Sequence, residues 1–590
     1  MDAGKAKINE IFAINRLLEV PFYQRSYVWK QDQWERFNDD MEYVTATKKP
    51  YFLGSVILKE LPTPTASESG ITDRRVIIDG QQRLTTIMLF FKAYFLLTDD
   101  NDKFVWNFCL ENHESKLIHG KADTKAFSSV MAIETIEEAK QFEWTDGKSN
   151  IVEAFRYFLA NISPDAISKQ TILGCVWLNT IDIQYDEDEQ QIFDTINSLG
   201  VTLTSAELLK NYLFNRDNLN AYEQYWESIF EPASDVDTRE WWNREIVTGR
   251  IKRTVIDLFF DSLLQILIQD PVYGVTAEDK IAYSRVDQLF RSYQDFLSNY
   301  YSKVNDISVD NTAFLEEMSR YAKLFKETFD PDCTNKAVSA HDSLRRLNVV
   351  IFGLKNSTLI PYVLYLVEGV QDKEELSELF DILESFIMRR IVTRETSKNY
   401  NRMFNSFILN QIKTPELLID AIRSGDDLNA RFPSDAELMQ AFGTESKLTN
   451  LQTKGILYLI ESSIRPKNSS TDILPFDSYS LEHLMPKKWR NNWDHPETKE
   501  LEWERDKRLL TLGNLAIITQ SLNASIRDAN WNKKRAGKGD KNPGLNACSS
   551  GLATFEGVLD KEVWNEEEIA KRGKRLAEEA IEVWSYPEGY

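Results

Sequence analysis

The sequence has few cysteines, few glycines and prolines, and no long apolar run. Its four cysteines are far apart among 590 residues and form no CxxC pair, which argues against a structural zinc site or a disulfide scaffold and favours the reducing cytoplasm. With 23 glycines and 17 prolines, the chain is neither fibrous nor low-complexity. The longest apolar stretch, 359–367, is far shorter than the roughly 20 residues that span a bilayer, and the N-terminus has no apolar signal segment. We expect a soluble, cytoplasmic protein with no membrane partner.

The charge of the chain is strongly negative. Lysine and arginine number 70 against 92 aspartates and glutamates, a formal net charge of −22, and the pI is near 4.9. Such a protein as a whole is repelled by nucleic acid and anionic membranes, so any nucleic-acid site must be a local basic cluster. The 42% hydrophobic and 27% charged residues are typical of a globular protein, and the length predicts several domains.

Periodicity and composition divide the chain into three predicted domains. Residues 1–220 alternate short β-type runs with helical segments, which indicates an α/β domain. Residues 221–460 are mostly long amphipathic helices without a repeat, and the sequence assigns them no function. A polar linker at 462–477 leads to a last domain at 478–590 that is rich in tryptophan, lysine and arginine. The predicted fold class is a multidomain α+β protein.

Several elements of the first domain are predicted individually. The expected strands are 18–22, 51–58, 75–79 and 172–185, and the expected helices are 81–97 and 188–199. The stretch 61–73 is rich in proline, serine and threonine, which predicts a surface loop. Thr204 and Glu207 have the spacing of a capping box, which predicts the start of another helix.

A histidine in the last domain has the surroundings of a general base. His483, one of only five histidines, directly follows Glu482 in SLEHLMPKKW. Neighbouring side chains on a strand point to opposite faces unless the strand bends, so an acid-histidine pair at a strand end can direct the carboxylate to a metal ion and the imidazole to a water molecule. Because the unperturbed imidazole pKa is about 6.5, neutral His483 is a usable base.

Two asparagines follow at spacings that complete such a site. Asn514 precedes the apolar run LAIIT, and its side chain can pin a hairpin and fix the orientation of the imidazole. Asn523 follows on a predicted helix, where its amide oxygen can face the same hard cation as Glu482. Two strands and a helix around one divalent ion predict a nuclease finger that uses Mg²⁺ or Mn²⁺.

Basic residues cluster around this predicted finger. Lys487 and Lys488 follow the histidine, and Lys533, Lys534 and Arg535 follow Asn523. A basic surface on an acidic protein suits a phosphate-bearing substrate, so we predict that these five residues contact DNA. A single lysine is more often a solvated surface charge, and the prediction therefore depends on the set.

The first domain contains a predicted anion site. An apolar run ends at Asp79, Gly80 permits a tight turn, and a helix begins at once, so free backbone N–H groups and the positive helix end face whatever lies above the turn. Arg83 in the first helical turn can bind a phosphate with two hydrogen bonds. Gln24 and Arg25 can close the site from the opposite side. The chain has no GxxxxGK[ST] motif, which argues against a P-loop ATPase.

These motifs resemble the two halves of GmrSD-type, modification-dependent restriction endonucleases. Over roughly 478–580 the pattern E-H-x-x-P, L-G-N-L, N-x-S and K is similar to the His-Asn-His (ββα-metal) nuclease domain, with Asn523 where the third family residue is usually histidine. YQR, DGQQR and the block 193–211 are similar to the ParB and sulfiredoxin-like N-terminal domain. The resemblance implies a nucleoside-triphosphate site formed by Tyr23, Gln24, Arg25, Asp79, Gly80, Gln81, Gln82 and Arg83.

The sequence therefore predicts a nucleotide-regulated, metal-dependent endodeoxyribonuclease with NTPase activity. It is expected to cleave modified foreign DNA such as phage DNA. Two alternatives stay open: an NTP-hydrolysing sensor whose C-terminal finger binds DNA without cutting it, and a helical interaction protein with neither activity. The sequence specifies neither the DNA modification, nor the base of the nucleotide, nor the effect of its hydrolysis, nor whether the chain forms a homo-oligomer.

Overall fold

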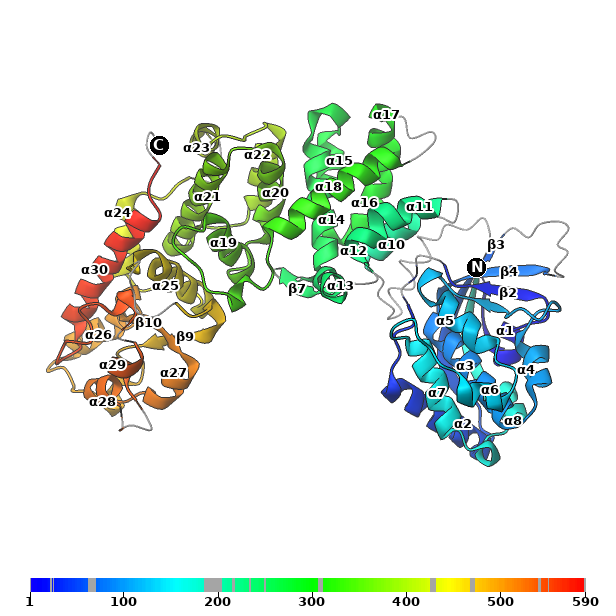
Figure 1. Cartoon of the computed structure of the whole chain (residues 1–590). Helices are drawn as coiled ribbons and strands as arrows, with labels where there is room; N and C mark the ends of the chain where they lie inside the picture. The colour runs from blue at the N-terminus through cyan, green and yellow to red at the C-terminus, as the bar shows by residue number, and fades with distance from the viewer. Residues whose placement is uncertain are drawn as a thin grey trace. The chain divides into compact units, whose positions relative to one another are not determined.

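A computed structural model describes most of the chain. It covers residues 2–587 except 22–23, 25, 62–70, 185–203, 215–217, 233–234, 249–250, 306–310, 425–430, 467–472, 538, 540–542 and 550. Two compact units are distinguished: unit 1 comprises 1–203 and 210–219, and unit 2 comprises 204–209 and 220–590. The predicted α+β class is confirmed as a mostly helical protein with one larger sheet (Figure 1).

Unit 1 is built around a mixed six-stranded sheet. Its strands are β1 (Asp2–Lys7), β2 (Arg16–Glu19), β3 (Tyr51–Leu61), β4 (Asp73–Asp79), β5 (Leu117–Ile118) and β6 (Val176–Ile183), in the order β1-β6-β3-β4-β2-β5. The β1/β6 and β3/β4 pairs are antiparallel, whereas β3/β6, β2/β4 and β2/β5 are parallel. The α/β character predicted for this part is confirmed, and the likeness to the ParB fold stays a prediction.

Two of the strand predictions need correction. The strand expected at 18–22 lies at 16–19, and the segment expected as strand from 172 begins as helix α8 (Lys169–Cys175), with β6 starting at Val176. The helix forms because Ser168 caps it by accepting the backbone N–H of Thr171. The predicted loop 61–73 and the predicted helix 188–199 lie largely or wholly outside the described residues.

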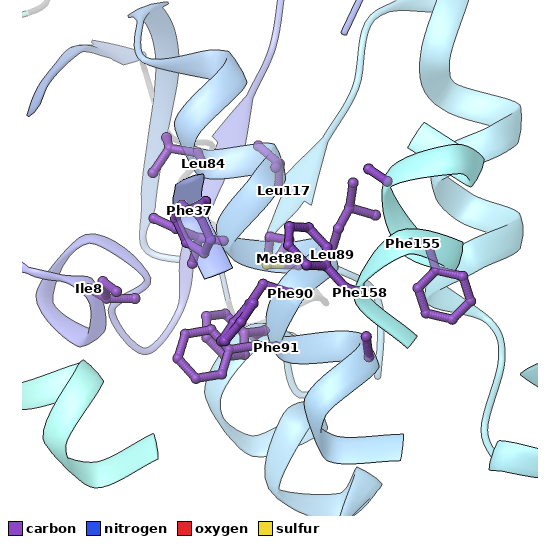
Figure 2. Packing of buried hydrophobic residues seen from close by; sticks show 14 of the residues in the cluster. Ile8, Phe37, Leu84, Met88, Leu89, Phe90, Phe91, Leu117, Phe155 and Phe158 are labelled. Carbon is purple, nitrogen blue, oxygen red and sulfur yellow. The ribbon is translucent and has the colours of Figure 1, made fainter. Parts of the chain in front are cut away.

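The core of unit 1 surrounds a helix that is buried on nearly every side. Its helices are α1 (Ile8–Ile11), α2 (Gln31–Thr47), α3 (Gln81–Leu97), α4 (Asn101–Phe108), α5 (Lys121–Met131), α6 (Ile136–Gln141), α7 (Asn150–Asn161) and α8. Helix α3, predicted at these same bounds, buries most of its residues, as expected of a central helix. Figure 2 shows Phe90 of α3 near Phe37 and Phe158, with ring centroids 5.4 and 5.5 Å away. This packing holds the middle of α3 against α2 and α7.

Unit 2 consists mainly of helices. They are α11 (Leu219–Tyr222), α12 (Ser228–Phe230), α13 (Val236–Asn243), α14 (Val255–Gln269), α15 (Ala277–Tyr283), α16 (Leu289–Phe296), α17 (Ser302–Val304), α18 (Thr312–Thr328), α19 (Ser343–Asn348), α20 (Ile360–Gly369), α21 (Lys373–Thr393), α22 (Tyr400–Leu409), α23 (Pro415–Ser424), α24 (Asp435–Gly443), α25 (Asn450–Ile464), α26 (Lys499–Arg508), α27 (Gln520–Ile526), α28 (Trp531–Ala536), α29 (Leu545–Cys548) and α30 (Glu566–Val583). Two hairpins join them: β7 (Glu245–Thr248) with β8 (Ile251–Thr254), and β9 (Tyr479–His483) with β10 (Leu515–Thr519). None of the described helices has both the length and the apolar character that crossing a bilayer requires.

The predicted capping box at the border of the two units is confirmed. Helix α10 (Ser205–Leu213) begins directly after Thr204. The Thr204 hydroxyl accepts the N–H of Glu207 at 3.2 Å, and the Glu207 carboxylate accepts the N–H of Thr204 at 3.0 Å. Two backbone donors that the helix leaves unpaired are thereby satisfied.

Buried polar contacts connect the middle helices of unit 2 with the end of the chain. Glu384 on α21 pairs with Arg346 on α19 and accepts the indole N–H of Trp584 at 2.8 Å. Glu461 on α25 accepts the backbone N–H groups of Ala553 and Thr554, at 2.9 and 2.7 Å. The described parts of the predicted middle and last domains therefore share one compact unit, while the division of the chain into three domains stays a prediction.

Candidate functional site

The acid-histidine pair lies at the end of a short hairpin. Glu482 and His483 close β9, which pairs antiparallel with β10 so that His483 faces Leu515 and Glu482 faces Ala516. Strand β10 leads directly into α27, which carries Asn523. The predicted order of strand, strand and helix is thus present (Figure 1).

Asn514 fixes the chain next to this strand end. Its side chain is fully buried. Nδ2 donates to the carbonyls of Met485 and Leu509 at 2.8 and 3.1 Å, and Oδ1 accepts the N–H of Met485 at 2.8 Å and the indole N–H of Trp564 at 3.1 Å. Every hydrogen-bonding position of the amide is occupied. Asn514 therefore holds the backbone two residues beyond His483, and any orienting effect on the imidazole acts through that backbone.

Helix α30 supports the same turn from behind. Arg572 is buried and donates to the carbonyls on either side of Asn514, those of Gly513 at 2.8 Å and Leu515 at 2.7 Å. Burial lowers the pKa of the Arg572 guanidinium to about 9. A Cβ at Gly513 would lie 2.1 Å from the carbonyl oxygen of Ile569, so only glycine permits this close approach.

The Glu482 carboxylate is paired with a buried lysine. Lys534 on α28 is fully buried, and its ammonium donates to Glu482 Oε1 and, at 2.7 Å, to the carbonyl of His483. The prediction that Lys534 lies on an exposed basic surface is therefore wrong. In the structure Asn530 caps α28, and the helix directs Lys534 inward while its neighbour Lys533 is exposed.

Burial shifts the pKa values of the groups around the strand end. It raises the pKa of the Glu482 carboxyl and lowers that of the Lys534 ammonium, and each charge opposes the shift of the other. Burial, with Lys487 and Lys534 nearby, lowers the pKa of His483 to about 4. The half-buried imidazole is therefore neutral near pH 7.

Asn523 is attached to the hairpin through its amide nitrogen. Nδ2 donates to Ser480 Oγ at 3.0 Å and to the carbonyl of Leu481 at 3.1 Å, so Oδ1 is the atom that remains for a cation. Within the described part of the chain, no three His, Cys, Asp or Glu side chains gather as a metal-binding group. The donor chemistry of Glu482 and Asn523, two oxygens, suits a hard cation whose other ligands are water and phosphate. Glu482 Oε1, however, already has an ammonium partner.

The five predicted DNA-contacting residues are not all exposed. Lys487, Lys488 and Lys533 are exposed, Lys534 is buried, and Arg535 is intermediate. The Arg535 guanidinium donates to two backbone carbonyls. Exposed lysines next to the hairpin are thus fewer than the sequence suggested, and their contact with DNA stays a prediction.

The Asp79-Gly80 turn of unit 1 has the predicted strand-to-helix geometry. Gly80 has φ of 102° and directly precedes α3, and a Cβ there would lie 2.8 Å from Val56 Cγ2, so the turn requires glycine. Arg83 Nη1 lies 3.6 Å from Asp79 Oδ2 and donates to the carbonyl of Ser55 at 2.6 Å. Both charged side chains of the DGQQR motif therefore lie at the turn.

Two glutamines connect Gln24 and Val28 with this turn. Gln24 Nε2 donates to the carbonyl of Ile78 at 3.1 Å, and Gln82 Oε1 accepts the N–H of Val28 at 2.9 Å. Gln81 is buried. Tyr23 and Arg25 lie outside the described residues.

A buried polar network that the sequence did not predict lies beside the turn. The Tyr27 hydroxyl bonds the Thr86 hydroxyl at 2.7 Å, and the Tyr27 N–H donates to Asp123 Oδ2 at 2.5 Å. His119 Nε2 lies 3.1 Å from the Thr85 hydroxyl, and burial lowers the His119 pKa to about 3. Nothing in their spacing links His119 and Asp123 to the motif, because the link is formed by the fold.

Comparison with known families identifies both ends of the chain. The family model of the GmrSD restriction endonuclease N-terminal domain matches residues 8–214, and that of the GmrSD C-terminal domain matches residues 432–579. The chain belongs to the GmrSD restriction endonuclease family. As a GmrSD restriction endonuclease it acts on DNA, and the nuclease family suggests a divalent metal ion. A comparison with curated proteins gave no significant match.

Proposed function

We propose that this GmrSD-family chain is a nucleotide-regulated type IV restriction endonuclease that cleaves modified phage DNA. The observation that carries the proposal is the Glu482-His483 pair at a rigidly held strand end within the match to the GmrSD C-terminal domain. The neutral imidazole and the adjacent carboxylate are the two groups that hydrolysis of a phosphodiester needs from the protein.

In the proposed reaction His483 accepts the proton of the attacking water. The water oxygen forms a bond to phosphorus, and the bond from phosphorus to the leaving sugar oxygen breaks. Glu482 and Asn523 would hold Mg²⁺ or Mn²⁺, which when bound stabilises the developing negative charge. Asn514 keeps the backbone beside His483 in place, and exposed Lys487, Lys488 and Lys533 attract the phosphate backbone.

The proposed nucleotide site is the Asp79-Gly80 turn. The positive N-terminal end of α3 and the Arg83 guanidinium suit the phosphates of a nucleoside triphosphate. Hydrogen bonds of Gln24 to Ile78 and of Val28 to Gln82 bring Gln24 and Val28 to the same place. Binding or hydrolysis there would control cutting in unit 2.

Cleavage assays on matched DNA test the proposed function. Full-length protein with Mg²⁺ or Mn²⁺ is incubated with hydroxymethylated, glucosylated, phosphorothioate and unmodified DNA, each with and without nucleoside triphosphate. We expect that the protein cuts at least one modified DNA and that this cutting depends on the nucleoside triphosphate. Unmodified DNA should be cut little. Nucleotide turnover without cleavage of any DNA would instead support the sensor that the sequence analysis left open.

Removing Arg83 should abolish nucleotide binding. In the wild type a saturating nucleoside triphosphate should raise the melting temperature of unit 1 by linkage, because it binds only the folded state. Arg83→Ala and Asp79→Ala should lose this shift. Arg156→Ala, which removes an exposed arginine paired with Glu153 on α7, is the matched control and should keep it. The assignment is wrong if the Arg83 and Asp79 variants keep the full shift.

The pH dependence of cleavage should reflect the lowered pKa of His483. Because that pKa is about 4, the base should stay mostly neutral down to about pH 5, so the His483-dependent rate should hold between pH 8 and about pH 5. Lys487→Ala removes a cation that lowers the pKa and should move the acid limb to higher pH, whereas Lys488→Ala should move it less. The measurement is the initial cleavage rate across overlapping buffers. A fall in rate centred at about pH 6.5 would contradict the lowered pKa of His483.

A further inference from the structure

Lys534 occupies a position that the proposed metal ion also requires. Its side chain is fully buried, and the Glu482 side chain is 10% exposed. The ammonium donates to one carboxylate oxygen and to the carbonyl of His483. It therefore contacts both residues of the acid-histidine pair.

A buried lysine of this kind is costly unless it is paired. Transferring an ammonium from water into the protein interior is unfavourable, and the Glu482 carboxylate and the His483 carbonyl provide the compensating contacts. The Asn530 cap and the bond from the Trp531 indole N–H to the carbonyl of Lys561 at 2.8 Å hold α28 in place. The ammonium is thus kept beside the carboxylate by the helix that carries it.

This pairing changes what a divalent cation meets at Glu482. The cation must either share the carboxylate with the ammonium or displace the ammonium from Oε1. In both cases two positive centres lie close together where water screens them poorly. The Lys534 ammonium and the divalent cation repel each other at such a distance, so the ammonium lowers the affinity of Glu482 for the cation.

We propose that Lys534 is a positioning residue that holds Glu482 and His483 in place and competes with the divalent cation for the Glu482 carboxylate. The inference rests on the proposed role of Glu482 as a metal ligand. It predicts that the metal affinity of the free protein is low because of this one lysine. It also distinguishes Lys534, which is buried and bonded to Glu482, from the exposed Lys487, Lys488 and Lys533.

Cation binding by full-length variants tests this proposal without any measurement of activity. Mn²⁺ is titrated into the protein, and the free ion is followed by its electron paramagnetic resonance signal. Lys534→Met removes the charge and keeps most of the side-chain volume, and it should bind Mn²⁺ about tenfold more tightly than the wild type, or more. Lys533→Met makes the same change of net charge on the exposed neighbour, and it should change the affinity by less than about twofold. Glu482→Gln should weaken binding.

The outcomes separate this inference from the proposed function. If Glu482→Gln leaves Mn²⁺ binding unchanged, Glu482 is not a ligand and both proposals are wrong. If Glu482→Gln weakens binding but Lys534→Met does not strengthen it, only the competition is wrong and Lys534 is purely structural.

Lys534→Met leaves Glu482 buried without its partner, which can prevent folding. A second comparison tests the inference in that case. The double variant Glu482→Gln with Lys534→Met removes both charges, so it should fold, as a melting scan would show. Relative to Glu482→Gln alone, it should bind Mn²⁺ through the remaining ligands more tightly, because the repelling ammonium is gone. Equal or weaker binding by the double variant would overturn the inference.

Discussion

His483→Ala should reduce DNA cleavage by a factor on the order of 10² to 10⁴, the range typical of losing a general base. The loss should appear in the rate of cutting and not in DNA binding, because the substitution removes the group that accepts the water proton and leaves Lys487, Lys488 and Lys533 in place. The measurement is the rate of plasmid or phage DNA cleavage at saturating DNA, together with a gel-shift titration for affinity. His483 is half-buried at the end of a strand, so the fold should survive.

Two comparisons make the result specific to the base. His495→Ala removes an exposed histidine whose Nδ1 lies 3.8 Å from Glu502, and cleavage should stay close to that of the wild type. Glu482→Gln should lose activity that additional metal ion partly restores, whereas His483→Ala should not respond to metal. Rescue of His483→Ala by high Mn²⁺ would assign the imidazole to metal binding and would contradict its role as a base.

The elements around both motifs were predictable because local sequence specifies them. Gly80 at the end of an apolar run fixes the turn before α3, and the capping pair Thr204 and Glu207 fixes the start of α10. The apolar run LAIIT forms β10 as expected. The segment from 172 was misread because its apolar residues suit a helix or a strand equally well, and only the Ser168 cap selects the helix.

The supporting residues of the candidate nuclease site could not be predicted from spacing. Trp564 bonds Asn514 from 50 positions away, and Arg572 bonds the carbonyls of Gly513 and Leu515 from 59 and 57 positions away. Both contacts arise through the packing of α30 and the segment before it. Lysine is a residue type that usually lies at the surface, and the burial of Lys534 depends on how α28 lies against β9. Charge clusters in a sequence therefore identify a region, but they do not separate residues that can face DNA from residues that hold the site together.

The hydrogen bonds of the Asn514 side chain predict that Asn514→Ala strongly lowers the stability of unit 2. Asn514→Ala would leave the N–H of Met485 and the indole N–H of Trp564 without an acceptor, and the carbonyls of Met485 and Leu509 without this donor. A buried polar group that loses its partner costs about 1–3 kcal/mol. Because these losses share one site and are not additive, we expect unit 2 to lose roughly 3–6 kcal/mol of unfolding free energy.

Calorimetry on the full chain can assign this loss to one unit. The transition of unit 2 should move to a lower temperature, and that of unit 1 should not, because Asn514 and all the groups that it bonds belong to unit 2. Asn492→Ala is the matched control: it removes an exposed amide with a single bond to the carbonyl of Asp528 at 3.0 Å, so it should cost less than about 1 kcal/mol.

Cleavage by Asn514→Ala should also fall at temperatures where unit 2 is still folded. The backbone at Met485 is released two residues from His483, and misplacing a catalytic group by about 1 Å can cost on the order of 10²-fold in rate. An unchanged unit 2 transition would mean that other contacts hold the turn, and the structural role assigned to Asn514 would then be wrong. A lowered transition with full activity at low temperature would keep Asn514 as a stabilising residue and remove it from the orientation of His483.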